Sequence, residues 1–598
     1  MTQTNGLSRR QFMATTAALA GVWMLPKDFL GQVLAAPQLP SEAPTTLQQT
    51  IRLGSVLKNK FRVTAAGPGE AYIPRLDLIG KAPAAARLKQ RRSLVYLGHL
   101  SDNHIIDAQS PGRLEPLVAL TATFVDATRP QDTMTVQVLS AMVTSLVDAM
   151  ESPLTGAPMA AVFNTGDNAD SMSALELRWS INTLDGVAVT PNSGAPGVYE
   201  GIQVWPESTY AYQPGNPGAD EYGTYGFPQL DGVLDAAVSQ NVESPGLPVP
   251  WYSVYGNHDS LFMGNINPGE MMRQWAQGDS KAATWSGSGF NMLNGWEAST
   301  SALQRLVDQV QYQLGLRPGT RKVTPDAKRS MLEQGQFMRE HMNTTPLPGP
   351  VGHGFTSENL KNGETWWKTD VGPFFRVFGL DSCSQVAGAN GAIPEAQFNW
   401  LKSELAKATA EKKLCLVNCH HNSLSLDNDA EPTLAAGQRL VHAEEFVEML
   451  LGFPHMIAWF NGHSHRNMII PHAKSGAGFW EIAAASCVDY PQQQQLLEIV
   501  DNRDGTLSIF TTVINHSSPP VWTEGDYSQT GLASLSRQLA GNSWMFEPWT
   551  LVGSPLDRNT ELLMPAPFDM SQITDAQLEK SHVAQRARLA AYRKGKPA

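Results

Sequence analysis

Short apolar runs that end in polar residues recur along the middle of the chain. Gly, Asn, Asp, Ser or His follows each run within a few positions, which is typical of buried strands. The runs are Leu94–Leu97, Ala160–Phe163, Trp251–Tyr255, Leu414–Val417 and Met456–Phe460. Stretches with helical periodicity lie between them, at 134–150, 301–314 and 394–410. The alternation predicts an α/β fold with helices layered on sheets, whose strand ends are the usual place for ligands.

Two insertions are predicted to interrupt this alternation, at about 171–248 and 260–370. Within the first, residues 190–230 are rich in Pro, Gly and aromatic side chains. We expect these aromatics to pack on one another rather than to line a base or lipid pocket. The second insertion contains helical pieces, and Thr324-Pro325-Asp326 predicts an N-cap, a first-turn proline and a first-turn acid for one of them.

The remaining patterns divide the chain into four parts. Residues 1–36 form an N-terminal signal segment, residues 37–92 form a lead-in with no strong pattern, residues 93–515 form the main domain, and residues 516–598 form a C-terminal extension. Near the end of the main domain, Asp501–Gly505 separates two strand-like runs and predicts a hairpin. Thr574 is expected to cap a final helix with a basic end.

Residues 1–36 have the order of an export signal. Arg9 and Arg10 precede Phe12, a mildly apolar stretch follows, and small residues stand before Pro37. The pattern resembles a twin-arginine (Tat) signal. We therefore expect the Tat machinery as a partner and a periplasmic, cell-envelope or extracellular location.

Composition narrows the class of protein. Of 598 residues, 42% are hydrophobic, which excludes a wholly disordered chain. With 44 Lys+Arg against 56 Asp+Glu, the net charge of -12 argues against binding a nucleic-acid polymer. Four Cys exclude a disulfide scaffold, although Cys383 and Cys487 are equally compatible with a pair or with buried thiols. No apolar run reaches the ~18 residues of a transmembrane segment. The sequence leaves the oligomeric state open.

Five polar blocks stand where the predicted strands end. They offer carboxylate, amide and imidazole donors, a set that suits Mn, Fe or Zn. About eight donors are enough for two ions that share a bridge and keep positions open for water. The blocks are Asp102-Asn103-His104, Gly166-Asp167-Asn168-Ala169-Asp170, Gly256-Asn257-His258-Asp259, His420-His421 and Gly462-His463-Ser464-His465.

In type and order, these blocks resemble the motifs of the calcineurin-like metallophosphoesterase superfamily. The resemblance spans Asp102 to His465, and the Tat-type signal with long insertions is similar to a bacterial branch of that family. It implies a layered αββα sandwich around two divalent or trivalent metal ions. It also implies a first ligand set of Asp102, His104, Asp167 and His465, and a second of Asp167, Asn257, His420 and His463.

The resemblance also implies catalytic roles. His258 would lie beside the substrate phosphate and help protonate the leaving group. Asp170 would orient His258. His421 is expected to point away from the ions, and Asp259 to be a structural hydrogen-bonding partner. The chain departs from the protein phosphatases at Ser171-Met172, where they carry Arg-Gly, and Asn422 replaces the proline usual after the lone-histidine block. Arg113 is expected to be a surface arginine, with a phosphate contact as the alternative.

The expected activity is a hydrolase reaction on a small phosphate ester. A metal-bridging hydroxide would attack a phosphomonoester or a phosphodiester, and the sequence does not separate the two. The alternative is a non-catalytic exported metal-binding protein with a vestigial site.

Overall fold

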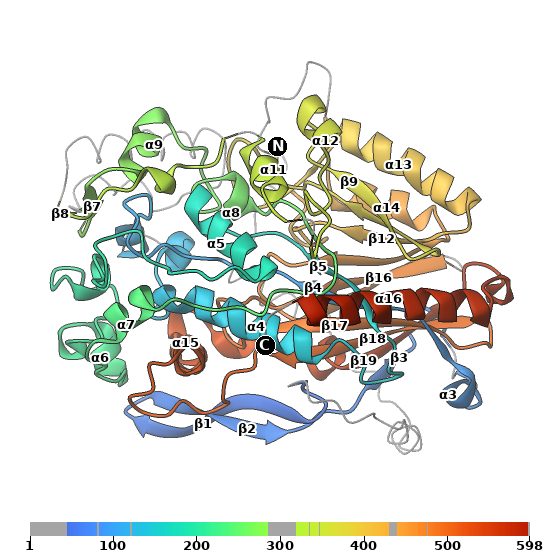
Figure 1. Cartoon of the computed structure of the whole chain (residues 1–598), viewed down its shortest axis with the longest axis horizontal. Helices are drawn as coiled ribbons and strands as arrows, with labels where there is room; N and C mark the ends of the chain where they lie inside the picture. The colour runs from blue at the N-terminus through green and yellow to red at the C-terminus, as the bar shows by residue number, and fades with distance from the viewer. Residues whose placement is uncertain are drawn as a thin grey trace, which may run out of the picture.

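In the computed structural model of the protein, two mixed β-sheets packed face to face form the centre (Figure 1). The structure describes residues 45–80, 83–119, 122–284, 319–333, 335–345, 347–429, 439–474 and 477–595. The expected export signal and the helix expected at 301–314 lie outside these residues. Helices cover the outer faces of the two sheets, so the predicted layered αββα sandwich is confirmed.

The first sheet has seven strands, and β17 is its central strand. Strands β4, β5 and β6 run parallel, whereas β17 joins β4 antiparallel. The β17–β18 turn is the hairpin predicted around Asp501–Gly505. In sheet order the strands are β3 (Ile73–Arg75), β19 (Thr560–Pro565), β18 (Thr506–Asn515), β17 (Gln493–Asp501), β4 (Arg92–Leu100), β5 (Met159–Asn164) and β6 (Trp251–Ser253).

The second sheet has six strands, of which the four inner ones run parallel. Its two edge strands, β15 and β9, are antiparallel to their neighbours. In sheet order the strands are β15 (Met468–Lys474), β16 (Ala477–Ala483), β14 (Met456–Asn461), β12 (Leu414–Asn418), β10 (Phe375–Gly379) and β9 (Trp367–Val371).

Strand β12 shows how alternation builds the layers. Leu414 and Leu416 belong to the core cluster that includes residues of both sheets. Cys415 and Val417 belong to the outer cluster with α13 (Glu395–Ala410) and α14 (Ala443–Leu451). Successive side chains of a strand point to opposite faces, so a fully apolar strand requires cover on both sides. On the other outer side, α4 (Thr135–Asp148) and α5 (Ala174–Asp185) pack on the first sheet.

The two ends of the described chain both contribute to the first sheet. The lead-in supplies β3 and the extension supplies β19, and the two strands pair in parallel. The lead-in also forms a hairpin of β1 (Gln49–Lys58) and β2 (Phe61–Pro68). No strand was predicted there, because every residue of β1 is at least partly exposed. The division into four parts stays a prediction.

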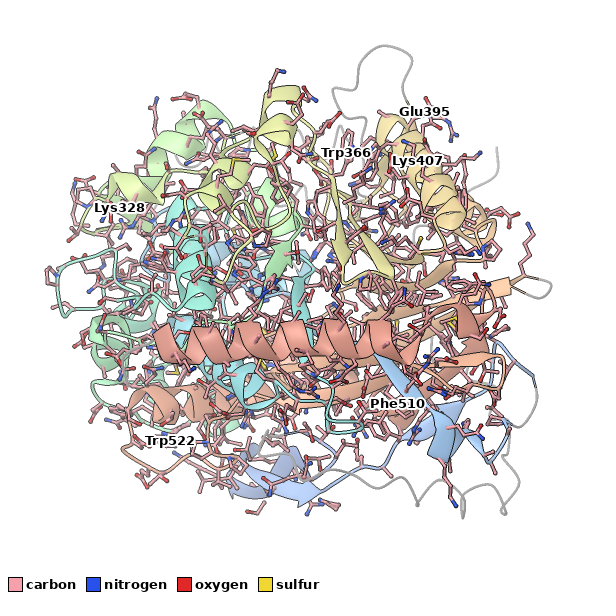
Figure 2. All side chains as sticks on the ribbon, turned by 45° about the vertical axis from the view of Figure 1, so that its right-hand side comes forward. Lys328, Trp366, Glu395, Lys407, Phe510 and Trp522 are labelled. Atoms are coloured by element: carbon pink, nitrogen blue, oxygen red, sulfur yellow. The ribbon has the colours of Figure 1, made fainter. Side chains whose placement is uncertain are left out.

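The last helix, α16 (Asp575–Gly595), lies across the front of the sandwich. In Figure 2 it runs between Lys407 of α13 above and Phe510 of β18 below. Thr574 accepts a hydrogen bond from the backbone N–H of Gln577, as expected for its cap. No helix within the described residues has the length and apolarity needed to span a bilayer.

The described parts of the insertions consist mainly of short elements. Aromatic side chains of 190–230 do pack together, with Tyr212, Tyr222 and Phe227 in mutual contact and Trp544 of the extension against them. The predicted helix start at Thr324 is wrong, because Asp326 caps only a single 3₁₀ turn, η6 (Ala327–Arg329). The other helices and paired strands are α3 (Arg87–Gln90), α6 (Glu221–Tyr225), α7 (Val233–Ser239), α8 (Asn257–Ser260), α9 (Glu270–Ala276), β7 (Ser280–Ala282), β8 (Thr320–Lys322), α11 (Gln336–Met342), α12 (Ser357–Asn362), β11 (Ile393–Pro394), β13 (Leu440–Val441) and α15 (Gln529–Asn542).

Candidate metal centre

The seven predicted metal ligands all follow the carboxyl ends of parallel strands. Asp102 and His104 come after β4, Asp167 after β5, and Asn257 opens α8 after β6. On the facing sheet, His420 follows β12, and His463 and His465 follow β14. Because parallel strands of both sheets end at one edge of the sandwich, the two sets of loops meet there. The structure brings all seven side chains together.

The backbone around the ligands is tightly packed and unusual in conformation. A Cβ on Gly256 would lie 2.0 Å from Asp167 Oδ1, and a Cβ on Gly462 would lie 2.2 Å from Asp102 Oδ2. Glycine is therefore required where these loops approach the carboxylates. Five ligands have positive φ, a strained state that folded proteins keep mainly at functional sites. They are Asp102, His104, Asp167, His463 and His465.

The first donor set has the spacing of a single ion site. His104 Nε2 lies 3.0 Å from His465 Nε2 and 3.4 Å from Asp167 Oδ2. Asp102 Oδ1 lies 3.3 Å from His465 Nε2 and 3.9 Å from His104 Nε2. Ligand atoms ~2.1 Å from a tetrahedral ion stand ~3.4 Å apart, so the four residues fit one ion.

The second donor set fits an ion equally well. His420 Nε2 lies 2.9 Å from Asn257 Oδ1 and 3.1 Å from Asp167 Oδ2. His463 Nδ1 lies 3.1 Å from Asn257 Oδ1 and 3.3 Å from His420 Nε2. Asp167 Oδ2 thus belongs to both sets, which is the position of a bridging ligand.

Burial and charge at the centre favour bound cations. Burial opposes the ionisation of Asp102 and Asp167, but the neighbouring histidines together lower the pKa of both carboxyl groups, His465 foremost for Asp102 and His420 foremost for Asp167. The nearby carboxylates likewise outweigh burial and raise the pKa of His104 to about 10 and the pKa of His420 to about 9. Buried anions therefore hold protons on the imidazoles, and a metal ion would replace these protons as the compensating charge.

His258 lies beside the donor sets without belonging to either. Its backbone N–H donates to Asp167 Oδ1 at 2.8 Å, and its ring packs edge-on against the His104 ring with 4.5 Å between centroids. Its Nδ1 lies 2.6 Å from the carbonyl oxygen of Asp170. Nδ1 therefore carries the proton of the neutral ring, and Nε2 has no hydrogen-bond partner among the described residues. Burial lowers the pKa of His258.

Asp170 contacts His258, the residue that it was predicted to orient, through its backbone carbonyl oxygen. Its carboxylate lies 3.0 Å from His104 Nδ1 and forms an ion pair with Arg113. The sequence predicts that Asp170 stands near the site, but not which of its oxygens contacts which histidine. That choice depends on the path of the backbone after Asp167.

Three charged residues that support the first donor set were not predicted from the sequence to do so. His465 Nδ1 lies 2.6 Å from Asp489, which forms a two-point ion pair with Arg129. Arg113, expected at the surface, is fully buried between Asp170 and Asp132, so neither expectation for it holds. An acid within an ordinary loop and two arginines in irregular segments carry no local signal of these contacts.

His421 lies close to the second donor set, since one of its ring nitrogens is within 4.8 Å of the donor atoms of His420 and His463. Both of its ring nitrogens have other partners, Ser382 Oγ and the carbonyl oxygen of Ala389, each at 2.8 Å. Asp259 accepts hydrogen bonds from the backbone N–H groups of Asn168, Ala169 and Gly256, and so joins the loops that carry Asp167 and Asn257.

All four cysteines lie within the described residues and are buried free thiols. Cys383 and Cys487 therefore do not form the pair that the sequence left open.

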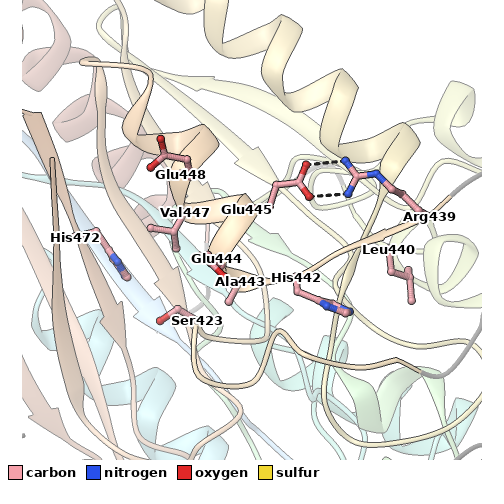
Figure 3. Close-up of a pocket in the computed structure, with 10 residues that line it drawn as sticks. All are labelled: Ser423, Arg439, Leu440, His442, Ala443, Glu444, Glu445, Val447, Glu448 and His472. Carbon is pink, nitrogen blue, oxygen red and sulfur yellow. Dashed lines mark hydrogen bonds and ion pairs between the residues drawn. The ribbon is translucent and has the colours of Figure 1, made fainter. Parts of the chain in front are cut away.

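A separate surface hollow of about 890 Å³ lies over α14 and β13 (Figure 3). Its lining includes His442, His472 and Glu448, and the Arg439–Glu445 ion pair stands at one side. None of the seven predicted metal ligands lines it. The hollow is therefore distinct from the candidate centre.

Comparisons with known proteins give only weak similarities. No family model and no curated protein matches the chain. Among solved structures, a dimetal phosphatase from Danio rerio is 10% identical and has a TM-score of 0.31, over 71% of this chain and 100% of the phosphatase.

Two further structures are similar at the same level. The sulfate thiohydrolase SoxB of Thermus thermophilus is 11% identical over 77% of this chain, with a TM-score of 0.26. A candidate 5'-nucleotidase of Staphylococcus aureus is 11% identical over 74% of this chain, with a TM-score of 0.25. The chain spans only 61% and 58% of these two proteins. Such slight similarity does not assign a function to this chain.

Proposed function

We propose that this protein is an exported, binuclear-metal phosphoric ester hydrolase. The observation that carries the proposal is Asp167 Oδ2, which lies 3.4 Å from His104 Nε2 and 3.1 Å from His420 Nε2. One carboxylate oxygen thus serves two complete donor sets, with an unligated histidine beside them. This combination suits hydrolysis of a phosphate ester better than simple metal storage.

The centre would hold two ions of the Mn, Fe or Zn type. Asp102, His104 and His465 would bind one, Asn257, His420 and His463 the other, and Asp167 both. Together the ions would activate water and neutralise charge on the phosphate oxygens.

His258 would act on the ester through Nε2. Its Nδ1 is held by the carbonyl oxygen of Asp170, so only Nε2 can exchange a proton with the substrate. An anionic phosphate beside the ring favours the protonated form and offsets the effect of burial. His258 would thereby stabilise the phosphoryl group and protonate the departing alkoxide.

A substrate panel on metal-reconstituted protein tests this proposal. We expect turnover of p-nitrophenyl mono- or diesters that requires added metal, and the ratio of the two rates would assign the preferred class. Protein that binds two ions and hydrolyses none of the esters would instead favour the non-catalytic alternative.

Export forms a separate part of the proposal. The paired arginines at positions 9 and 10 are the expected recognition motif for the Tat machinery. Replacing both by lysine should leave the protein in the cytoplasm, as measured by cell fractionation. Unchanged export of that variant would argue for another route.

A further inference from the structure

The two histidines of the first donor set share one kind of support. His104 Nδ1 lies 3.0 Å from Asp170 Oδ1, and His465 Nδ1 lies 2.6 Å from Asp489 Oδ2. Each imidazole therefore presents Nε2 to the predicted ion while a carboxylate accepts from Nδ1. Such an acceptor fixes the tautomer and ring orientation and strengthens the nitrogen as a metal donor.

Arg129 connects the two supporting carboxylates. Its Nε and Nη2 contact the two oxygens of Asp489 at 2.8 and 3.3 Å, and its Nη1 lies 3.6 Å from Asp170 Oδ1. Arg113 neutralises the other side of Asp170 and pairs with Asp132 at 3.1 Å. The backbone N–H of Arg129 donates to the same Asp132 at 3.0 Å. These contacts define a buried set of charges, here called the arginine–carboxylate network: Arg113, Arg129, Asp132, Asp170 and Asp489. Arg113 also lies 3.9 Å from Glu115, which pairs with Lys281.

The network is almost completely shielded from solvent. Arg113 is 0% exposed, Arg129 1% and Asp489 3%. Water therefore cannot replace a lost partner, and removing one charge leaves its partner buried and unpaired. The guanidinium of Arg129 also lies 4.9 Å from the ring centre of Phe546, so a side chain of the C-terminal extension covers it.

Within the described part of the chain, no carboxylate contact of this kind supports the second donor set. The Nδ1 atom of His420 lies 2.8 Å from the backbone carbonyl oxygen of Thr165, which is a neutral acceptor. Asn257 Nδ2 likewise donates to the carbonyl oxygen of Gly264 at 3.0 Å. A defect in the network should therefore affect one ion site and leave the other in place.

We infer that Arg129 and Asp489 are positioning residues that hold His104 and His465 ready for one of the two metal ions. The inference rests on the metal centre of the proposed function. Neither residue touches the ions or the substrate. Their effect would appear as weaker binding of a single ion, about 10–100-fold for loss of such a partner.

Metal titration of Asp489→Asn tests the inference. The variant keeps the size of the side chain and removes its charge. Metal-free protein would be titrated with Mn²⁺ by calorimetry, and the electron paramagnetic resonance spectrum would distinguish a coupled Mn pair from a single Mn. We expect wild-type protein to bind two ions. The variant should bind one ion with wild-type affinity and the other about 10–100-fold more weakly. Its spectrum should therefore be that of a single Mn at metal concentrations at which wild-type protein holds a coupled pair.

Glu561→Gln provides a matched control. Glu561 is buried and accepts two hydrogen bonds from Arg87, at 3.2 and 2.9 Å, on β19, which stands three strands from β4 in the first sheet. The Glu561→Gln variant should have a lower thermal stability than wild-type protein, but it should bind the same number of ions with the same affinity. Arg129→Lys keeps the charge but cannot contact two carboxylates at once, so it should give an intermediate loss of one ion even if Asp489→Asn does not fold.

The outcomes separate the inference from the proposed function. Two ions bound with wild-type affinity by both network variants would overturn the inference alone. Equal weakening of both ions, or the same loss in Glu561→Gln, would also overturn it. A wild-type protein that binds no metal ion would overturn the metal centre itself.

Discussion

The two halves of the proposed metal centre have the same kinds of donor atoms but differ in the residues that support those donors. Behind His104 and His465 lie buried carboxylates held by arginines, whereas a neutral carbonyl lies behind His420. The difference indicates that two sets of similar donor atoms need not bind their ions with equal affinity. A charged acceptor makes an imidazole a stronger donor, so we expect the half with the arginine–carboxylate network to hold its ion more tightly.

The largest effect on metal binding and activity is expected at Asp167, which belongs to both donor sets. Asp167→Asn removes the charge of the one carboxylate that both donor sets share. We expect loss of both ions and a fall in ester hydrolysis to the uncatalysed background, measured by metal analysis together with turnover. If the variant kept two ions, Asp167 would not be the bridge.

His258→Ala should separate chemistry from metal binding. Because the ring lies in neither donor set, both ions should remain while turnover falls about 10²–10⁴-fold, the usual range for one acid–base residue. Alkyl esters should suffer more than activated aryl esters, which leave without a proton. Equal slowing of both esters would mean that His258 mainly binds the phosphate, and loss of an ion would make it a ligand.

A histidine outside the centre tests how burial alone, with no carboxylate partner, changes the pKa of an imidazole. His341 is buried, its Nδ1 faces the carbonyl oxygen of Phe337 at 2.9 Å, and burial lowers the pKa of His341 to about 3. The unfolded chain takes up a proton below the ordinary histidine pKa near 6.5, and the folded chain does not. Stability is therefore fully present above that pH and falls as pH drops from about 6.5 toward 3.

His341→Phe should remove this part of the pH dependence. Between pH 7 and pH 5, the loss of unfolding free energy should be about 2 kcal/mol smaller in the variant than in the wild type. Denaturant unfolding at the two pH values measures it. An unchanged pH dependence would mean that His341 is solvated or paired in solution.

The candidate metal ligands could be predicted from the sequence, whereas the charged residues that support them could not. The five polar blocks could be found because each follows an apolar run, and strand ends gather ligands from distant parts of the chain. Asp489 and Arg129 could not be found that way. Their partners are 24 and 360 positions away, and only the folded path of the chain joins them.

The fold shows the same division. Strand β12 was predictable because burial on both faces leaves a continuous apolar run, Leu414–Val417. The β1–β2 hairpin was missed because β1 contains no fully buried side chain and therefore lacks that signal. Asp170 shows the limit at a single residue, since its carbonyl and carboxylate oxygens support different histidines.

Stepwise loading of the metal-free protein with Mn²⁺, with phosphodiesterase and phosphomonoesterase rates recorded at each step, tests the central claim most directly. We predict two binding steps of different affinity, with little hydrolysis after the first equivalent and full activity only after the second. Activity that needs no metal, or is complete with one ion, would contradict a centre built on the shared Asp167.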